Sequence, residues 1–258
     1  MQLAKHVAQG KLTYLNQSKE AISVSENEHY RWLAFACNND EPIIQSVMLK
    51  RKPWKLTLPH QTALMLPLLF FKPNSVVELG LGGGNIQRFI NSVSTKITTH
   101  SIEHNSVVID CFNQYFNPQG NPVNVIHNDS KQWLQQNNFE YDWYVCDIYQ
   151  QEIQSYNNAV SQLEHITANI KPNTCLSINL PDATDNEVNL LLTILKQIST
   201  DHEITYFHIP NYLNIVIHLI PKQWQTYKRI KRNKHSYLPA NTFSRWKGFW
   251  LHGKKVSV

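Results

Sequence analysis

The stretch 75–88 constrains the fold of this chain more than any other part of the sequence. It begins with apolar residues typical of a buried strand, continues through a glycine cluster and then becomes compatible with a helix. Half of the eight glycines of the chain lie in this cluster, namely Gly80, Gly82, Gly83 and Gly84. Because glycine has no Cβ and tolerates positive φ, a ligand can approach such a loop closely. A strand, a glycine loop and a helix start together predict a nucleotide-binding turn, with a close helix–strand packing turn as the alternative.

Acidic residues follow the next three predicted strands. Thr98–Glu103 and Tyr141–Asp147 each end in an acid, and Val123–His127 is followed closely by Asp129. Open α/β sheets bind ligands at the carboxyl ends of their strands. Glu103 lies about twenty residues beyond the glycine loop, where a carboxylate accepts the hydroxyl groups of a ribose. The order of these segments therefore predicts a nucleoside site at one edge of a parallel sheet, and a solvated strand end is the alternative for Glu103.

The flanking segments predict β-structure before the glycine loop and alternating helices and strands after it. Ile22–Val24 and Tyr30–Ala36 pair as a hairpin, and Lys11–Leu15 is either an edge strand or a loose arm. Further predicted elements are a strand at Ile43–Leu49, helices at Leu58–Phe71, Ser106–Phe116, Ser130–Gln136, Gln154–Ile170 and Asp185–Ser199, a strand at Cys175–Leu180, and a hairpin of Ile204–Ile209 with Leu213–Ile220. A parallel sheet that closes on an antiparallel hairpin is an α/β architecture.

Composition excludes several classes of protein. With 258 residues, 42% of them hydrophobic, the chain suffices for one α/β domain with appendages. It has no run of 18 apolar residues, and its first residues lack the apolar core of a signal peptide, so neither a membrane segment nor export is expected. The four cysteines form no C-x-x-C pair, and we interpret them as reduced thiols of a cytoplasmic protein, without disulfides or bound metal.

The net charge of +5 is distributed unevenly. No Asp or Glu follows Glu203, and the segment 222–258 contains ten basic residues and seven aromatic ones. The remaining 14 basic and 19 acidic residues leave a body with a net charge of −5. We prefer the interpretation that this segment packs on the acidic body or on a second subunit of a homodimer. An arm that binds nucleic acid through cations and stacking is the alternative.

Four motifs in order carry a resemblance to a known family. The series E-L-G-L-G-G-G, S-I-E-H-N, N-D-S-K-Q-W-L and Y-D-W-Y-V-C-D resembles the class I S-adenosylmethionine-dependent methyltransferase superfamily, in its spermidine synthase-like branch. The resemblance covers roughly residues 20–220. It implies a Rossmann-like sheet of seven strands. With the flanking segments, we expect a β-hairpin appendage at 1–57, a catalytic domain at 58–221 and a basic, aromatic-rich extension at 222–258.

The resemblance also implies a cofactor and the residues that hold it. The cofactor would be S-adenosylmethionine or its decarboxylated form, with Glu103 on the ribose and the glycine loop on the methionine part. Asp129 would accept the adenine amino group, or alternatively cap the helix that begins at Ser130. The expected cofactor-binding set is Glu78, Gly80, Gly82, Gly83, Gly84, Asn85, Glu103, Asp129 and Ser130.

For the reaction, the resemblance implies that Asp147 removes a proton from the attacking amine, which requires an acceptor within hydrogen-bond reach. His60 falls where the branch often has a tyrosine in the pocket for the transferred group, although a structural histidine is an equal alternative. Together with Gln45 and Tyr149, His60 forms the expected substrate-binding set.

The sequence departs from the branch at two places. The branch has small residues and a second acid three positions after the catalytic one, whereas this chain has Ile148, Tyr149 and Gln150. The glycine loop of aminopropyl transferases is followed by an acid, whereas this chain has Asn85. One lost charge pair at ~4 Å removes on the order of 4 kcal/mol at an effective dielectric constant of about 20. We therefore expect weak binding of a diamine such as putrescine and unchanged recognition of adenosine.

These arguments predict a spermidine synthase-like transferase that moves an aminopropyl or methyl group to a small-molecule acceptor. An amine, including a polyamine, is the first choice of acceptor. Methyl transfer to another acceptor and a non-catalytic nucleoside-binding protein are the alternatives. An adenine-base methyltransferase is disfavoured because D-I-Y-Q follows the fourth strand in place of a Pro-Pro-aromatic signature.

Overall fold

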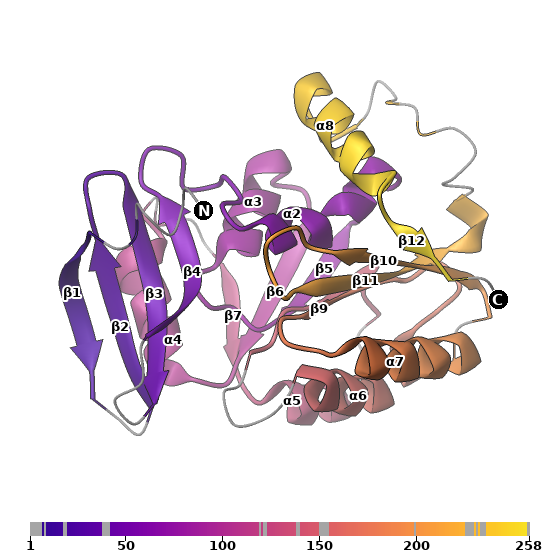
Figure 1. The fold of residues 1–258 in the computed structure, drawn as a ribbon, viewed down its shortest axis with the longest axis horizontal. Coiled ribbons are helices and arrows are strands. Elements are labelled where there is room, and N and C mark those ends of the chain that lie inside the picture. Colours follow the sequence, from indigo (N-terminus) through magenta and orange to yellow (C-terminus); the bar gives the residue numbers. More distant parts are fainter. Residues whose placement is uncertain are drawn as a thin grey trace.

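Two β-sheets organise the part of the chain that the computed structural model describes (Figure 1). The described residues are 7, 9–17, 20–37, 42–118, 120, 123–137, 140–149, 155–198, 200–224, 230, 232 and 236–256. Within these ranges no helix has the length and apolarity that a membrane crossing requires.

The first sheet contains four antiparallel strands in sequence order. Its strands are β1 (Lys11–Asn16), β2 (Glu20–Glu26), β3 (Tyr30–Cys37) and β4 (Ile43–Leu49). The expected hairpin corresponds to β2 and β3, and the expected edge strand to β1. Alternate residues of β2, Ile22 and Val24, are fully buried, because successive side chains of a strand point to opposite faces. The sheet therefore has one face that must be covered by the rest of the molecule.

The second sheet has the strand order β12-β10-β11-β9-β8-β5-β6-β7. Neighbouring strands from β9 to β7 are parallel, and β10, β11 and β12 are antiparallel to their neighbours. The bounds are β5 Ser75–Leu79, β6 Thr98–Glu103, β7 Asn124–His127, β8 Trp143–Cys146, β9 Cys175–Leu180, β10 His202–His208, β11 Ile215–Pro221 and β12 Lys254–Lys255. This arrangement confirms the Rossmann-like α/β class. It corrects the expected strand number, because β12 from the C-terminal segment joins the seven predicted strands.

Helices cover both faces of this sheet (Figure 1). On one face lie α2 (Pro59–Leu64), the 3-10 turn η1 (Leu66–Leu69), α3 (Asn85–Val93) and α8 (Ala240–Trp250). On the other face lie α5 (Ser130–Gln136), α6 (Ser155–Ile166) and α7 (Asp185–Ile198). Short 3-10 turns are η3 (Thr167–Asn169) and η4 (Lys222–Trp224). The helix expected at Ser106–Phe116 is α4 (Ser106–Cys111) followed by the π-helical turn η2 (Phe112–Phe116).

A chain of polar groups crosses the centre of the second sheet. The indole Nε1 of Trp143 donates to the hydroxyl of Ser177 at 2.9 Å, and that hydroxyl meets Nδ1 of His218 at 2.8 Å. The other ring nitrogen of His218 lies 3.1 Å from the carbonyl oxygen of Ala63 in α2. Complete burial lowers the pKa of His218 to about 3, against the opposing effect of the Ala63 carbonyl. The ring is therefore neutral at pH 7 and donates through Nε2 to α2.

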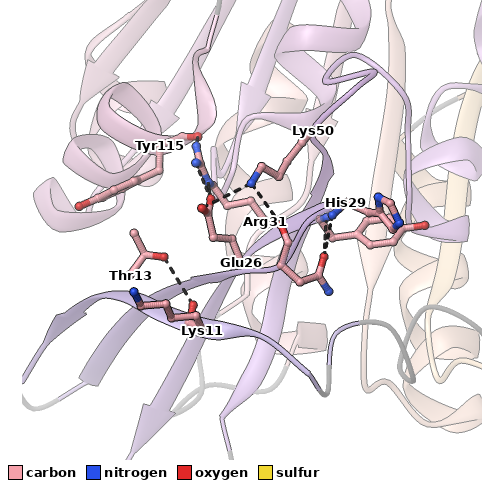
Figure 2. A network of polar contacts seen from close by, with 9 residues as sticks. Lys11, Thr13, Glu26, His29, Arg31, Lys50 and Tyr115 are labelled. Atoms are coloured by element: carbon pink, nitrogen blue, oxygen red, sulfur yellow. Dashed lines mark hydrogen bonds and ion pairs between the residues drawn. The ribbon is translucent and has the colours of Figure 1, made fainter.

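The first sheet packs on α4 and η2. The buried residues Ile22, Val24 and Leu33 of the sheet form one apolar cluster with Phe112 and Phe116. Figure 2 shows a polar network at the same boundary.

In that network, the Nε of Arg31 donates to Glu26 at 2.7 Å, and its Nη1 donates to the carbonyl oxygen of Tyr115 in η2 (Figure 2). Lys50 lies 3.4 Å from the same carboxylate. Burial raises the pKa of Glu26, but Arg31 and then Lys50 outweigh burial and hold this pKa below its ordinary value. Arg31 therefore links the first sheet to η2.

The described part of the C-terminal segment packs on the body of the protein. Phe243, Trp246 and Trp250 of α8 are buried in the cluster that contains α2 and α3. The ring centroids of Phe70 and Trp250 are 4.7 Å apart, and those of Phe89 and Trp246 are 5.5 Å apart. These contacts agree with the interpretation that the segment packs on the body of the protein. The cations at 228, 229, 231 and 234 lie outside the described residues.

Candidate functional site

The candidate site lies along the carboxyl edge of the parallel strands. Asp147 follows β8, the glycine loop follows β5, Glu103 ends β6 and Asp129 follows β7. The strand order places these groups in one row, with Asn179 of β9 beyond Asp147. Strands in a sheet are about 4.8 Å apart, so the row from β9 to β7 spans roughly 19 Å. We call its two parts the Glu103 end and the Asp147 end.

Two glycines of the loop are required by close contacts. Gly80 has φ 93°, and a Cβ there would overlap the carbonyl oxygen of Asp147. Gly84 has φ 66° and precedes α3, where a Cβ would overlap the ring of Phe112. Any other residue would therefore force the loop away from β8 or from η2. The loop is fixed on both sides by its neighbours.

The carboxylate of Glu103 is tied to the glycine loop. Its Oε2 accepts the backbone N–H of Leu81 at 3.1 Å, and its Oε1 accepts that of Asn105 at 3.0 Å. Nδ1 of His104 lies 3.2 Å from Oε1. Burial opposes ionisation, but these hydrogen bonds outweigh it and hold the pKa of Glu103 below its ordinary value. Glu103 is therefore an ionised acceptor held in one orientation at neutral pH.

Asp129 is the N-cap of α5. Its Oδ1 accepts the backbone N–H groups of Lys131 at 3.0 Å and Gln132 at 3.1 Å. The hydroxyl of Ser130 accepts a hydrogen bond from Gln162 of α6 at 2.8 Å. Both residues also border the cavity described below. The capping alternative for Asp129 is thus confirmed, and its contact with an adenine remains a prediction.

The buried, charged side chain of Arg88 holds the glycine loop in place. Arg88 donates to the carbonyl oxygens of Pro53 at 2.8 Å and Phe116 at 2.7 Å, and also to that of Gly83 and to Asn85 Oδ1. Burial lowers the pKa of Arg88 to about 9, so it stays protonated at neutral pH. Arg88 therefore fixes the loop without entering the row of site residues.

Asn85 is held on all sides by protein groups. Its Nδ2 donates to the carbonyl oxygen of Val47 at 2.9 Å and to Gln61 Oε1 at 3.1 Å, while its Oδ1 accepts from Arg88. Glu78 is 2% exposed and accepts the hydroxyl of Ser101 at 2.7 Å. Burial, with the nearby carboxylates of Asp147 and Glu103, raises the pKa of Glu78 to about 8. Both residues border the cavity, and neither presents an exposed charge to it.

Two asparagine side chains form a hydrogen-bonded relay that orients Asp147. Nδ2 of Asn179 donates to Asp147 Oδ1 at 2.8 Å, and Nδ2 of Asn214 donates to Asn179 Oδ1 at 3.0 Å. Asn214 lies in the turn between β10 and β11, directly after Tyr212 and Leu213. This relay fixes one oxygen of Asp147 and links it to the β10–β11 turn.

Two nitrogen atoms beside the site are buried and have no hydrogen-bond partner among the described residues. They are Nδ1 of His60 and Nε2 of Gln45. Burial lowers the pKa of His60, and the charge of Asp147 opposes this change, so the two side chains lie close enough to interact. A buried polar group without a partner is costly unless a ligand or water satisfies it. Both nitrogen atoms are therefore available to a polar ligand or a water molecule in the cavity.

A single cavity of about 540 Å³ brings these residues together. The predicted site residues that line it are Gln45, His60, Glu78, Gly80, Gly82, Asn85, Glu103, Asp129, Ser130, Asp147 and Tyr149. Gly83 and Gly84 do not line it: Gly83 donates its N–H to the Ser46 hydroxyl at 2.9 Å, and Gly84 faces Phe112. Gln150 lies outside the described residues.

Sequence reasoning missed several polar residues of the cavity. Gln61, Asn179 and Asn214 all line it. Asn179 lies inside a strand whose residues are all buried and which has the sequence of a core element, so no local signal separated it from a structural residue. Gln61 directly follows His60, and its position next to a predicted pocket residue was the available signal.

In a comparison with known proteins, the chain is similar to a probable polyamine aminopropyl transferase of Bifidobacterium longum strain NCC 2705, with 32% identity over 109 residues. The match covers 42% of this chain and 24% of that protein, so the chain spans about a quarter of the length of this relative. No protein-family model matches the chain.

Solved structures establish the fold. A probable spermidine synthase from Corynebacterium glutamicum superposes with a TM-score of 0.67 and 14% identity, over 92% of this chain and 86% of that one. Human methyltransferase-like protein 13 in complex with SAH superposes with a TM-score of 0.56 and 15% identity, over 74% and 90%. The chain therefore shares its fold with this probable spermidine synthase and with this methyltransferase-like protein.

Proposed function

We propose that this protein is a transferase that binds S-adenosylmethionine or its decarboxylated form in the cavity and transfers an aminopropyl or methyl group to an amine. The observation that carries the proposal is the row of groups along one sheet edge. An ionised acceptor lies at the Glu103 end, a fixed glycine loop in the middle, and an oriented carboxylate at the Asp147 end. The relative and the solved structures support the same class of reaction.

The residues of the cavity fit an adenosyl sulfonium. Glu103 would accept the ribose hydroxyl groups, and the backbone at Asp129 and Ser130 would meet the adenine. Nε2 of Gln45 and Nδ1 of His60 supply polar partners where the protein itself offers none. A cavity of about 540 Å³ is within the usual size range of small-molecule sites.

A bound sulfonium would supply an electrophilic carbon for the acceptor nitrogen, and its sulfur would be the leaving group that keeps the electron pair of the broken carbon–sulfur bond. The proton leaves the nitrogen for the carboxylate of Asp147 and then passes to solvent. Because Asn179 occupies Oδ1, Oδ2 of Asp147 is the oxygen that would accept this proton. Orientation and proton removal are the contributions that the protein would make.

A transfer assay tests the proposal. Radiolabelled S-adenosylmethionine and decarboxylated S-adenosylmethionine are each incubated with the protein and with a mixture of mono- and diamines, and labelled amine is measured. Asp147→Asn keeps the size of the side chain and removes the base, so turnover should fall by about 10²–10⁴-fold. The control is Asp185→Asn, which changes an exposed acid of α7 that does not line the cavity and should leave turnover unchanged.

Binding of either donor without transfer to any amine would contradict the proposed reaction and favour a non-catalytic nucleoside-binding protein. Methyl transfer to an acceptor that is not an amine would support the proposed donor site and contradict the proposed acceptor. Transfer that is equally fast in Asp147→Asn would remove this residue from the mechanism.

A further inference from the structure

The acceptor part of the cavity combines one carboxylate with amide groups and an apolar rim. Of the described residues that line the cavity, the acids are Glu78, Glu103, Asp129 and Asp147. Glu103 and Asp129 accept backbone N–H groups at the other end of the row, and Glu78 is buried against Ser101. Asp147 is thus the carboxylate that remains for an acceptor.

The groups next to Asp147 are neutral. Asn179 and Asn214 form the relay behind it, and burial keeps the pKa of His60 below its ordinary value, opposed by Asp147. An amide binds a neutral polar group well but does not neutralise a second ammonium ion. A cation taken from water without a paired anion carries a large desolvation cost.

Several residues in the lining of the same cavity are apolar, and some of them are exposed. Ile43 and Ile44 of β4 line it and are 43% and 39% exposed. Ile148 and Tyr212 also line it. Leu213, between the lining residues Tyr212 and Asn214, is 80% exposed, the largest value among the exposed large apolar side chains described.

Apolar groups from separate parts of the fold therefore flank one opening: β4 of the first sheet, the segment after β8 and the β10–β11 turn. Single exposed apolar residues need no explanation, but several that border one ligand cavity indicate a contact surface. Ile148 directly follows Asp147, and Tyr212 lies two residues before Asn214 of the relay, so this side of the surface lies at the Asp147 end, where the distant part of an acceptor would lie.

We infer that the acceptor is a monoamine whose amino group is attached to an apolar body, hydrocarbon or aromatic, in place of a short diamine. This inference rests on the proposed function and specifies its substrate class. The amino group meets Asp147, and the apolar body lies against the lining residues Ile43, Ile44, Ile148 and Tyr212. Among the described residues that line the cavity, no further carboxylate is left to pair with a second ammonium ion at the far end of the acceptor.

Binding to the protein saturated with methylthioadenosine tests the inference without requiring turnover. Calorimetry compares hexylamine with 1,6-diaminohexane, which has the same carbon chain and one additional ammonium group. Hexylamine should bind about ten-fold more tightly. Ile44→Ser should weaken hexylamine binding by about three- to ten-fold. The matched control is Ile198→Ser, which changes an isoleucine of α7 with the same 39% exposure that does not line the cavity.

Equal or tighter binding of the diamine would overturn the inference, and so would an unchanged hexylamine affinity in Ile44→Ser. Absence of binding by both amines, with methylthioadenosine bound, would also overturn it while leaving the donor site in place. Absence of methylthioadenosine binding would instead show that the proposed function itself is wrong.

Discussion

Single residues of the site differ in how far the sequence could predict them. Glu103, Asp129 and Asp147 each follow a short strand pattern, and strand ends of a parallel sheet meet at one edge, so local sequence was sufficient. The orientation of Asp147 was not predictable, because it depends on Asn179 and Asn214, which lie 32 and 67 positions further along the chain. Asn85 was predicted as a cofactor contact, but its amide is engaged by protein groups because α3, β4 and α2 meet there.

The relay behind Asp147 gives a prediction at this scale. Asn179→Ala removes the hydrogen bond that holds Asp147 Oδ1, so turnover should fall by about ten-fold while the affinity for methylthioadenosine stays unchanged. Steady-state kinetics and calorimetry measure the two quantities. Asn189→Ala, at an exposed position of α7, is the matched control. A parallel loss of nucleoside affinity in Asn179→Ala would show a structural role in place of positioning.

The buried His218 predicts an acid-sensitive contribution to stability. Its pKa is about 3 in the folded state and 6.5 in the unfolded state, so the unfolded chain binds more protons between these values. The contribution is complete above pH 6.5 and is lost as the pH falls toward 3. From pH 7.5 to pH 5 the loss should be about 2 kcal/mol, at 1.36 kcal/mol per pKa unit.

Urea unfolding of the parent and of His218→Gln at both pH values isolates this contribution. The decrease in unfolding free energy on acidification should be about 2 kcal/mol smaller in the variant. Glu78→Gln should change the pH dependence in the opposite sense, because the pKa of Glu78 is raised in the folded state to about 8. Identical pH dependence in the parent and His218→Gln would contradict the neutral assignment of this ring.

At the scale of elements, the strands were predicted better than the C-terminal segment. The alternating or continuous apolar patterns of β2, β3, β9, β10 and β11 were read from the sequence, and the observed bounds differ by a few residues. The strand β12 is only two lysines long and has no β pattern, so only its pairing with Thr205 and Tyr206 defines it. The helix α8 carries few charged residues and its burial depends on η1 and α3, which no local pattern could show.

The helix α8 should be an integral part of the core. Trp246 is 2% exposed and packs on Phe89, so Trp246→Ala should lower the unfolding free energy by about 3–5 kcal/mol. Trp54→Ala removes the same side chain from a 41% exposed position and should cost less than about 1 kcal/mol. Chemical denaturation measures both. Equal small effects would mean that the C-terminal segment covers the body without stabilising it.

At the scale of the whole molecule, the first sheet completes the cavity. Phe35, Ile43 and Gln45 line it from the first sheet, whereas the charged site residues come from the second. The sequence predicted both parts of the fold, but their docking depends on contacts such as Arg31 to the carbonyl oxygen of Tyr115, 84 positions away (Figure 2). Contacts over such separations leave no local pattern in either segment.

The contact of Arg31 with η2 predicts how the two sheets are held together. Arg31→Ala removes hydrogen bonds from a charged group to Glu26 and Tyr115, so it should lower the unfolding free energy by about 1.5–3 kcal/mol. Lys50→Ala removes a partner of Glu26 that does not contact Tyr115, and the loss should stay below about 1 kcal/mol. Denaturant unfolding compares the two variants, and equal losses would contradict a specific role of Arg31 in docking.

Calorimetry with S-adenosylmethionine, decarboxylated S-adenosylmethionine and methylthioadenosine tests most directly whether the cavity is an adenosyl site. All three should bind the parent, and Glu103→Ala should weaken each, because two hydroxyl hydrogen bonds to a charged acceptor are worth roughly 1.5–3 kcal/mol each. Glu164→Ala, at an exposed position of α6, should change nothing. Unchanged affinity for all three nucleosides in a folded Glu103→Ala protein would contradict the assignment of this cavity.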